Sequence, residues 1–285
     1  MALVPPHELS YPFRMWDSLI VLVRVVALVY IGLVLVLAGC QRAMIYYPAR
    51  ASESEAMVTA AGEGMSPWRN DDGDIIGWRS RTASDDADAI LIFHGNAGFA
   101  AHRGYFARGL YPEFTVYIFE YPGYGTRSGR PSEPNFYAAA EDAVKQLSDE
   151  HDGRIFLGGE SLGSGVATYL AGTQPDHIAG LFLVTPFTSL VDVARSHYPI
   201  FPVRWLMRDR YESARHLENY EGPVAILVAG RDEIVPAKFG QKLYDGYDGP
   251  KRIWNQEDRT HNTLDYGAQS PWWDEVVTFL TRTTE

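Results

Sequence analysis

Five short apolar runs, separated by glycines and by segments of helical pattern, constrain the fold of this chain most strongly. Each run is continuously apolar, which is typical of parallel strands that are buried on both faces of a sheet. Between the runs, residues 134–150 and 161–172 carry apolar side chains at helical spacing. The alternation of strand and helix predicts an α/β fold, with a mostly parallel central sheet and helices on both faces. The five runs are residues 89–95, 115–123, 154–159, 179–186 and 223–230.

The segments around these runs are less regular. Residues 42–48 (RAMIYYP) and 74–80 (DIIGWRS) are expected to form the first two strands, with a polar stretch between them. Residues 188–220 contain no clear strand and are rich in aromatic residues, arginine and proline. Two structures fit this segment equally well: a small helical lid inserted after the run at 179–186, or a single crossover helix with a long loop.

The N-terminal segment has its own apolar pattern. Residues 25–39 are an uninterrupted apolar run, a length that fits the core of a signal peptide, whereas a spanning helix needs about 20 residues. The run ends in Leu-Ala-Gly-Cys, which resembles the lipobox of bacterial lipoproteins, in which the cysteine is diacylated and becomes the first mature residue. Residues 1–40 are therefore expected to be a signal or lipoprotein leader with lipid on Cys40, ahead of a globular domain at 43–285.

Two other interpretations of this leader stay open. An uncleaved anchor helix would have Arg14 and Arg24 holding its start in the cytoplasm. In the third interpretation, Cys40 is an ordinary buried residue at a helix end. The lipoprotein and the anchor both place the globular domain beside a membrane, and we expect that domain to lie outside the cytoplasm.

Charge and cysteine content exclude several classes of function. The net charge of −11 comes from the globular part, and no cluster of Lys and Arg stands out. Nucleic acid is therefore not an expected partner, because its binding requires clustered basic residues. Cys40 is the single cysteine, so neither an intramolecular disulfide nor a cysteine-based metal site is possible.

The stretch GGESLGSG at 158–165 contains a G-x-S-x-G motif whose serine is Ser161. It follows a predicted strand and precedes a helix that is expected to begin at Leu162, which is the setting of a nucleophile elbow. So sharp a turn requires Gly159 and Gly163, because a Cβ at either position would clash. The helix N-terminus offers N–H groups to a developing oxyanion, and the N–H of Leu162 is expected to be one donor.

A serine nucleophile needs a base, and the base needs an acid that orients it. On this fold the order along the chain is serine, acid, histidine. Asp232 follows the run at 223–230, and neighbouring Glu233 is the second candidate for the acid. Beyond Asp232 the chain contains one histidine, His261. If the fold is right, His261 is therefore the base.

The second oxyanion donor is expected from the loop after the run at 89–95. We assign it to the N–H of Asn96, with Ala97 as the alternative. His94 precedes the serine in the chain, so it is expected to shape this loop and not to act as the base.

The chain resembles the α/β-hydrolases related to the bud-emergence protein and to mammalian membrane-linked α/β-hydrolase-domain proteins. The resemblance covers the chain from about residue 43 to its end, and it implies a triad of Ser161, Asp232 and His261 and an N-terminal membrane segment. One departure is Thr260, where relatives tend to have glycine directly before the histidine. The motifs that carry the resemblance are, in order, HGNAG, EYPGYGTRSGRPSE, GGESLGSG, TPFTSLVDVA, HYPIFPVRWLMRDRY, GRDEIVP and HNTL.

These features predict a membrane-associated serine hydrolase that cleaves carboxylic esters or thioesters, with no metal or organic cofactor. Its expected partners are a small-molecule or lipid acyl substrate and a membrane. A serine peptidase with the same triad is the alternative, although it would need an acidic pair to hold the substrate's α-amino group. A non-catalytic binding module on the same fold is a further alternative, disfavoured because no triad residue is missing.

Overall fold

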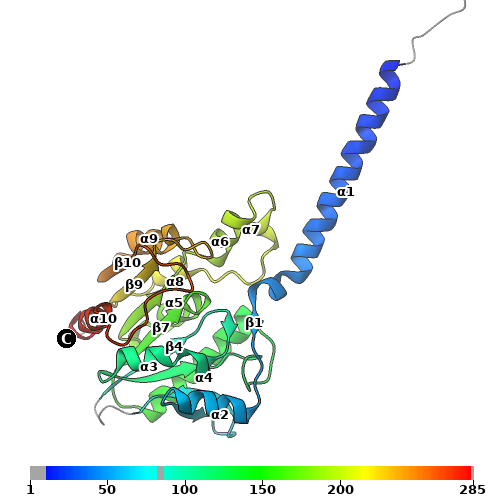
Figure 1. Cartoon of the computed structure of the whole chain (residues 1–285). Helices are drawn as coiled ribbons and strands as arrows, with labels where there is room; N and C mark the ends of the chain where they lie inside the picture. Colours follow the sequence, from blue (N-terminus) through cyan, green and yellow to red (C-terminus); the bar gives the residue numbers. More distant parts are fainter. Residues whose placement is uncertain (1–10, 82–86, 284–285) are drawn as a thin grey trace, which may run out of the picture. The chain divides into compact units, whose positions relative to one another are not determined.

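An eight-stranded sheet forms the centre of the unit that begins at Arg42, counted over the residues that the computed structural model describes, 11–81 and 87–283 (Figure 1). The strand order is β10-β9-β8-β7-β4-β6-β3-β2, and neighbours are parallel except where β3 pairs with β6 and with β2. The predicted α/β fold is confirmed. The strands are β2 (Ser66–Arg69), β3 (Ile75–Arg79), β4 (Asp88–Phe93), β6 (Phe114–Phe119), β7 (Ile155–Glu160), β8 (Gly180–Val184), β9 (Val224–Ala229) and β10 (Lys251–Gln256).

Side chains of the central strands point alternately into two cores. In β4, Leu91 and Phe93 belong to one core, whereas Ile90 and Ile92 belong to the other. All four are fully buried, which explains why such strands read as continuous apolar runs.

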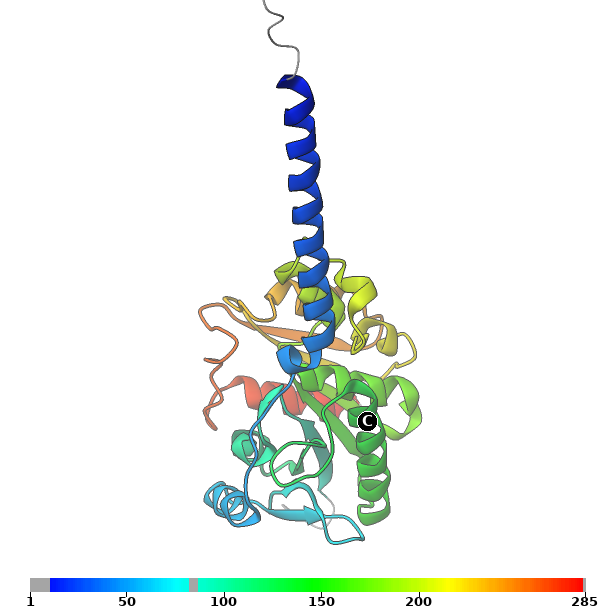
Figure 2. The ribbon, with the colours of Figure 1, turned by 90° about the vertical axis from the view of Figure 1, so that its right-hand side faces the viewer.

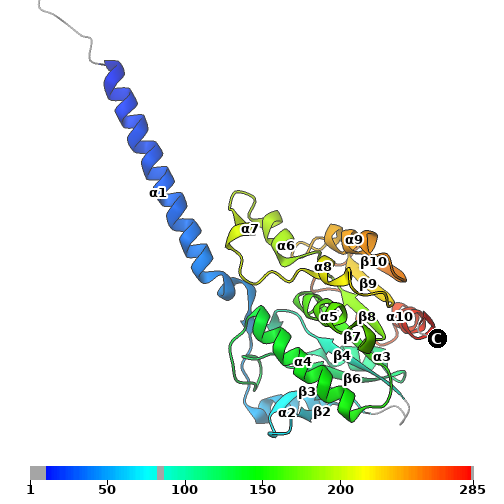
Figure 3. The same cartoon turned by 180° about the vertical axis from the view of Figure 1, so that it is seen from behind.

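Helices cover both faces of this sheet. The first core contains buried residues of α4, α5 and α9, and the second contains those of α2, α3 and α10. In Figure 2, red α10 and green α4 lie on opposite sides of the strands, and Figure 3 shows α4 and α5 in front of the sheet. These helices are α2 (Glu53–Gly62), α3 (Gly104–Leu110), α4 (Glu133–Glu150), α5 (Leu162–Thr173), α9 (Ala237–Gly246) and α10 (Trp272–Thr283).

The strand expected at 74–80 is present as β3, whereas the expectations for 42–48 and for the polar stretch after it were wrong. Residues 42–45 continue helix α1 (Tyr11–Ile45), and only β1 (Tyr47–Pro48) is extended, paired with β5 (Ala97–Gly98) in a small parallel sheet. The polar stretch at 49–72 contains α2 and β2. Helix α2 begins there because Ser52 and Glu55 form a reciprocal capping box.

Residues 188–220 form three short helices and not one crossover helix. Two carboxylates hold this segment to the rest of its unit. Buried Asp209 accepts two hydrogen bonds from Arg42, at 2.9 and 3.0 Å, and one from the Tyr46 hydroxyl at 3.1 Å. Glu133, at the start of α4, accepts the main-chain N–H groups of Arg210 and Tyr211. The helices of this segment are α6 (Leu190–His197), α7 (Val203–Leu206) and α8 (Ser213–Leu217). Elsewhere in the unit, 3₁₀ turns occur at η1 (Ala100–Arg103) and η2 (Pro175–His177).

The unit that ends at Gln41 is helical where it is described. The span Trp16–Ile45 contains an 18-residue window with a mean hydropathy of 2.9, and it is long and apolar enough to cross a membrane. A signal sequence meets the same criterion, so the helix alone does not separate an anchor from a cleaved leader. Cys40 is exposed and carries no disulfide.

Replacing Asp209 with Asn is expected to lower the free energy of unfolding by about 1–3 kcal/mol, because a buried acceptor loses its charge-assisted hydrogen bonds. Urea unfolding of the full chain in detergent, followed by tryptophan fluorescence, measures this loss. The matched control is Glu212→Gln in the same segment, whose carboxylate pairs with Arg210 and Arg215 near the surface. That control should cost less than about 1 kcal/mol, and equal losses in the two variants would contradict the role given to Asp209.

Candidate active site

The three residues assigned to the triad follow three strands of one parallel set. Ser161 comes directly after β7, Asp232 follows β9, and His261 follows β10. Because β7, β8, β9 and β10 are neighbours and parallel, their carboxyl ends meet at one edge of the sheet. In open α/β sheets this edge is where ligands bind.

Ser161 occupies a strained turn between β7 and α5. Its φ of 52° and ψ of −115° lie in a region that non-glycine residues seldom adopt. A Cβ on Gly159 would lie 2.5 Å from the Cα of Ser164, and one on Gly163 would overlap the carbonyl oxygen of Phe93. Two glycines therefore permit the close approach that presents Ser161 at the edge of the sheet.

Asp232 and His261 are joined by a short hydrogen bond, 2.7 Å from Nδ1 of the imidazole to Oδ2 of the carboxylate. The other carboxylate oxygen accepts the N–H groups of Ile234 and Val235 at 2.9 and 2.7 Å, so the acid is fixed in place. Because a carboxylate accepts from Nδ1–H, Nε2 is left as the basic nitrogen of the ring. Glu233, the second candidate acid, is exposed.

No hydrogen bond joins Ser161 to His261 among the interactions of the described residues. Hydrogen bonds between catalytic groups are often long until substrate is bound. The arrangement therefore brings acid and base together and places the serine at the same edge of the sheet.

The loop after β4 lies against the serine. A Cβ built on Gly95 would be 3.8 Å from the Cβ of Ser161. The Asn96 side chain donates to the carbonyl of Ile45 at 2.7 Å, and the Asn96 carbonyl accepts the N–H of Tyr47 and the hydroxyl of Tyr124. These bonds fix the side chain and the carbonyl of Asn96. The N–H groups of Asn96 and Leu162 stay our candidate oxyanion donors.

His94 is fully buried under this loop. Its Nδ1 lies 2.7 Å from the carbonyl oxygen of Gly95, and its own carbonyl accepts the hydroxyl of Tyr121. These contacts fit the expectation that His94 shapes the loop.

Sequence reasoning missed a carboxylate directly beside the serine. Glu160 accepts hydrogen bonds from Arg103 at 2.8 Å, Tyr105 at 2.7 Å, the N–H of Gly95 at 3.2 Å and Tyr266 at 3.3 Å. Burial by itself would raise the pKa of this carboxyl, but the charge of Arg103 and the hydrogen bonds lower that pKa to about 2. The sequence gives no signal for this cluster, because its members are far apart along the chain.

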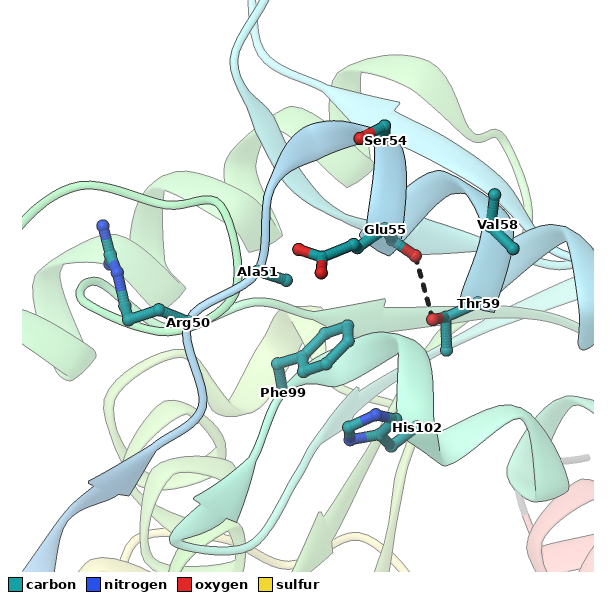
Figure 4. Close-up of a pocket in the computed structure, with 8 residues that line it drawn as sticks. All are labelled: Arg50, Ala51, Ser54, Glu55, Val58, Thr59, Phe99 and His102. Atoms are coloured by element: carbon teal, nitrogen blue, oxygen red, sulfur yellow. Dashed lines mark hydrogen bonds between the residues drawn. The ribbon is translucent and has the colours of Figure 1, made fainter.

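A pocket of ≈ 520 Å³ lies beside η1 and α2 (Figure 4). The rings of Phe99 and His102, 4.0 Å apart between centroids, form one side of it. None of its lining residues belongs to the proposed triad, so this pocket is separate from the immediate surroundings of Ser161. They are Arg50, Ala51, Ser54, Glu55, Val58, Thr59, Phe99 and His102.

Known proteins resemble this chain over most of its length. Residues 88–274 match the family model described as alpha/beta hydrolase fold. An uncharacterised protein of Mycobacterium tuberculosis is 35% identical over 92% of this chain and 94% of its own length. A lysophosphatidylserine lipase of Danio rerio is 31% identical over 62% of this chain, and the match spans about half (52%) of that lipase. These matches confirm the resemblance that the motifs indicate.

Solved structures share the fold at low sequence identity. An esterase of Pyrococcus furiosus superposes with a TM-score of 0.60 at 15% identity, covering 84% of this chain and 100% of the esterase. At that level of identity the likeness concerns the fold alone.

The depressed pKa of Glu160 predicts a pH-dependent contribution to stability. Taking about 4.3 for the unfolded chain and about 2 for the folded chain, the ionised carboxyl stabilises the fold by about 3 kcal/mol at pH 6 and by about half of that at pH 3. The contribution is complete above the unfolded pKa and is lost as pH falls through the folded pKa. Urea unfolding of wild type and Glu160→Gln at both pH values measures it, and a gap that does not narrow at pH 3 would refute it.

Proposed function

This chain belongs to the α/β-hydrolase fold family, and we propose that it is a membrane-associated serine hydrolase of carboxylic esters or thioesters that forms an acyl-enzyme on Ser161. The observation that carries the proposal is the 2.7 Å bond between His261 and a buried, doubly anchored Asp232, at the sheet edge where Ser161 occupies a strained turn. A turn serine with no chemical role would need neither the strain nor an oriented histidine.

In the proposed mechanism, the Ser161 hydroxyl attacks the acyl carbonyl carbon while Nε2 of His261 takes its proton. The N–H groups of Leu162 and Asn96 bind the oxygen that becomes negative. The imidazolium, stabilised by Asp232, then protonates the leaving alcohol or thiol as its bond to the acyl group breaks. Water attacks the acyl-enzyme with His261 again as base, which releases the acid and restores the serine.

The proposed substrates are esters or thioesters of acyl chains, and three observations support this proposal. One relative bears the name of a lysophosphatidylserine lipase. The N-terminal helix is apolar enough to cross a membrane. The segment at 188–220 exposes large apolar side chains, with Ile200 72% and Trp205 87% exposed.

The peptidase alternative gains no support from the acid nearest to the serine. Glu160 is paired with Arg103 and accepts further hydrogen bonds from Tyr105, Tyr266 and Gly95. Its charge is therefore compensated within the protein and is not presented to a substrate ammonium group.

We expect Ser161→Ala to lower the turnover of p-nitrophenyl esters at least about a thousandfold, since triad residues act as a unit. The measurement is the hydrolysis rate of the full chain in detergent on acyl groups of two to sixteen carbons, with the variant as blank. A rate that peaks at long chains supports an acyl-lipid or acyl-protein substrate, and a peak at two to four carbons indicates a small pocket. Retained activity in the variant would place the chemistry elsewhere.

The N-terminal segment is proposed to attach the catalytic unit to a membrane, with that unit outside the cytoplasm. Cys40 ends the apolar run after small residues, where a lipobox has its cysteine, and its side chain is exposed. We therefore propose lipid attachment at Cys40, with an intact spanning helix as the competing form.

Intact-mass and N-terminal peptide spectrometry of the protein purified from membranes is expected to find a diacylated Cys40 at the mature N-terminus. The variant Cys40→Ser is expected to keep the leader, because lipoprotein processing requires the thiol. An unmodified Cys40 inside an uncleaved chain would reject lipidation and leave the helix as anchor. Recovery of the active protein from the soluble fraction would reject both forms of attachment.

A further inference from the structure

We propose that Glu160, between Gly159 and Ser161, is a positioning residue that holds the oxyanion loop and the histidine loop against the serine, and that it does so only while Arg103 neutralises it. This inference rests on the proposed serine mechanism and adds to it an ion pair outside the triad. The oxyanion loop is defined as residues 95–97 and the histidine loop as residues 257–266.

The Glu160 carboxylate is the point at which these segments meet. Its Oε2 accepts the N–H of Gly95, in the oxyanion loop, at 3.2 Å and Nε of Arg103 at 2.8 Å. Its Oε1 accepts the hydroxyl of Tyr105, at the start of α3, at 2.7 Å and that of Tyr266, in the histidine loop, at 3.3 Å. The main chain of Glu160 continues directly into Ser161. One carboxylate therefore fixes the positions of both loops relative to the serine.

Arg103 completes the hold on the oxyanion loop. Its Nη2 donates to the carbonyl of Ala97 at 3.0 Å, while its Nε binds Glu160. The ion pair is therefore hydrogen-bonded to the loop on both sides of Asn96, at Gly95 and at Ala97. The direction of the Asn96 N–H depends on these two attachments, and an oxyanion donor works only when it is aimed at the position of the developing charge.

Electrostatics explains why Arg103 is required. Acyl transfer creates negative charge on the substrate oxygen next to the serine, and a bare carboxylate on the adjacent residue would oppose that charge. Both side chains are largely shielded from water, with 15% of Glu160 and 17% of Arg103 exposed, so solvent does little to weaken such a repulsion. The hydroxyls of Tyr105 and Tyr266 stay neutral donors, because burial holds their pKa values well above the usual range.

A second ion pair, between the starts of β4 and β7, provides a matched control. Asp88, the first residue of β4, pairs at 2.7 Å with Arg154, just before β7, and its side chain is 16% exposed. This pair lies at the amino ends of the two strands, whereas Glu160 lies at the carboxyl end of β7. Its carboxylate therefore matches that of Glu160 in burial, but the pair is remote from the serine.

The experiment measures ester hydrolysis by the full chain in detergent, per active serine counted by fluorophosphonate titration. Glu160→Gln is expected to lower kcat about 10–100-fold, with KM changed less than about threefold, because a displaced oxyanion donor affects the transition state more than the ground state. Arg103→Met is expected to lose at least as much. The double variant should lose less than the product of the two single losses, because each single change leaves a charge unpaired.

Two readouts separate positioning from simple loss of folding. Affinity for an alkyl boronic acid, whose tetrahedral adduct with serine imitates the oxyanion, should fall by about the same factor as kcat. Asp88→Asn should lower the unfolding midpoint and leave kcat per active serine within about twofold of wild type.

Different outcomes overturn different claims. If Glu160→Gln keeps kcat and boronate affinity within twofold of wild type, or if the two single losses simply multiply, the positioning role is wrong. If Asp88→Asn loses kcat as strongly as Glu160→Gln, the effect is one of folding and the role is again wrong. If Ser161→Ala stays active or still reacts with the fluorophosphonate, the proposed function fails first.

Discussion

The contact between the start of α5 and the end of β4 is the constraint on which the rest of the site depends. Helix α5 packs so closely on the sheet that a Cβ on Gly163 would overlap the carbonyl oxygen of Phe93. The chain must therefore turn between β7 and α5 within one residue, and Ser161 takes the positive φ of 52°. The strain is balanced by the packing of α5 against β7 and β4, and it leaves the serine at a helix N-terminus, where unpaired N–H groups are available.

Charge organises the surroundings of this turn. The acid Asp232 is fixed by two main-chain N–H groups and orients His261. Glu160 directly precedes the serine in the chain. It is neutralised by Arg103 and accepts hydrogen bonds from the oxyanion loop and from the histidine loop. A buried carboxylate that lacked such partners would be protonated or would destabilise the fold. The same hydrogen bonds that solve this desolvation problem also give the loops defined positions.

Carboxylates also attach the 188–220 segment. Asp209 accepts hydrogen bonds from Arg42 and Tyr46, at the beginning of the unit that starts at Arg42, and Glu133 accepts two main-chain N–H groups of the segment. The segment is therefore held in place where it meets the rest of its unit, while Trp205 in α7 is 87% exposed. An enzyme that takes acyl chains from a membrane would need a segment that is firmly attached at one end and exposes apolar side chains at the other. The 188–220 segment has both features, which supports the proposed substrate class.

Sequence alone predicted the central strands correctly, and it supplied the candidate elbow and the order of the proposed triad. Strands buried on both faces must be continuously apolar, and a single histidine follows Asp232. It did not reveal β10, because an edge strand is half exposed and KRIWNQ has few apolar residues. Only the tertiary structure joined Glu160 to Arg103 and Tyr266, 57 and 106 positions away. Such polar contacts have no periodicity along the chain; they exist because folding brings the carboxyl ends of separate strands, and the loops that follow them, to one edge of the sheet.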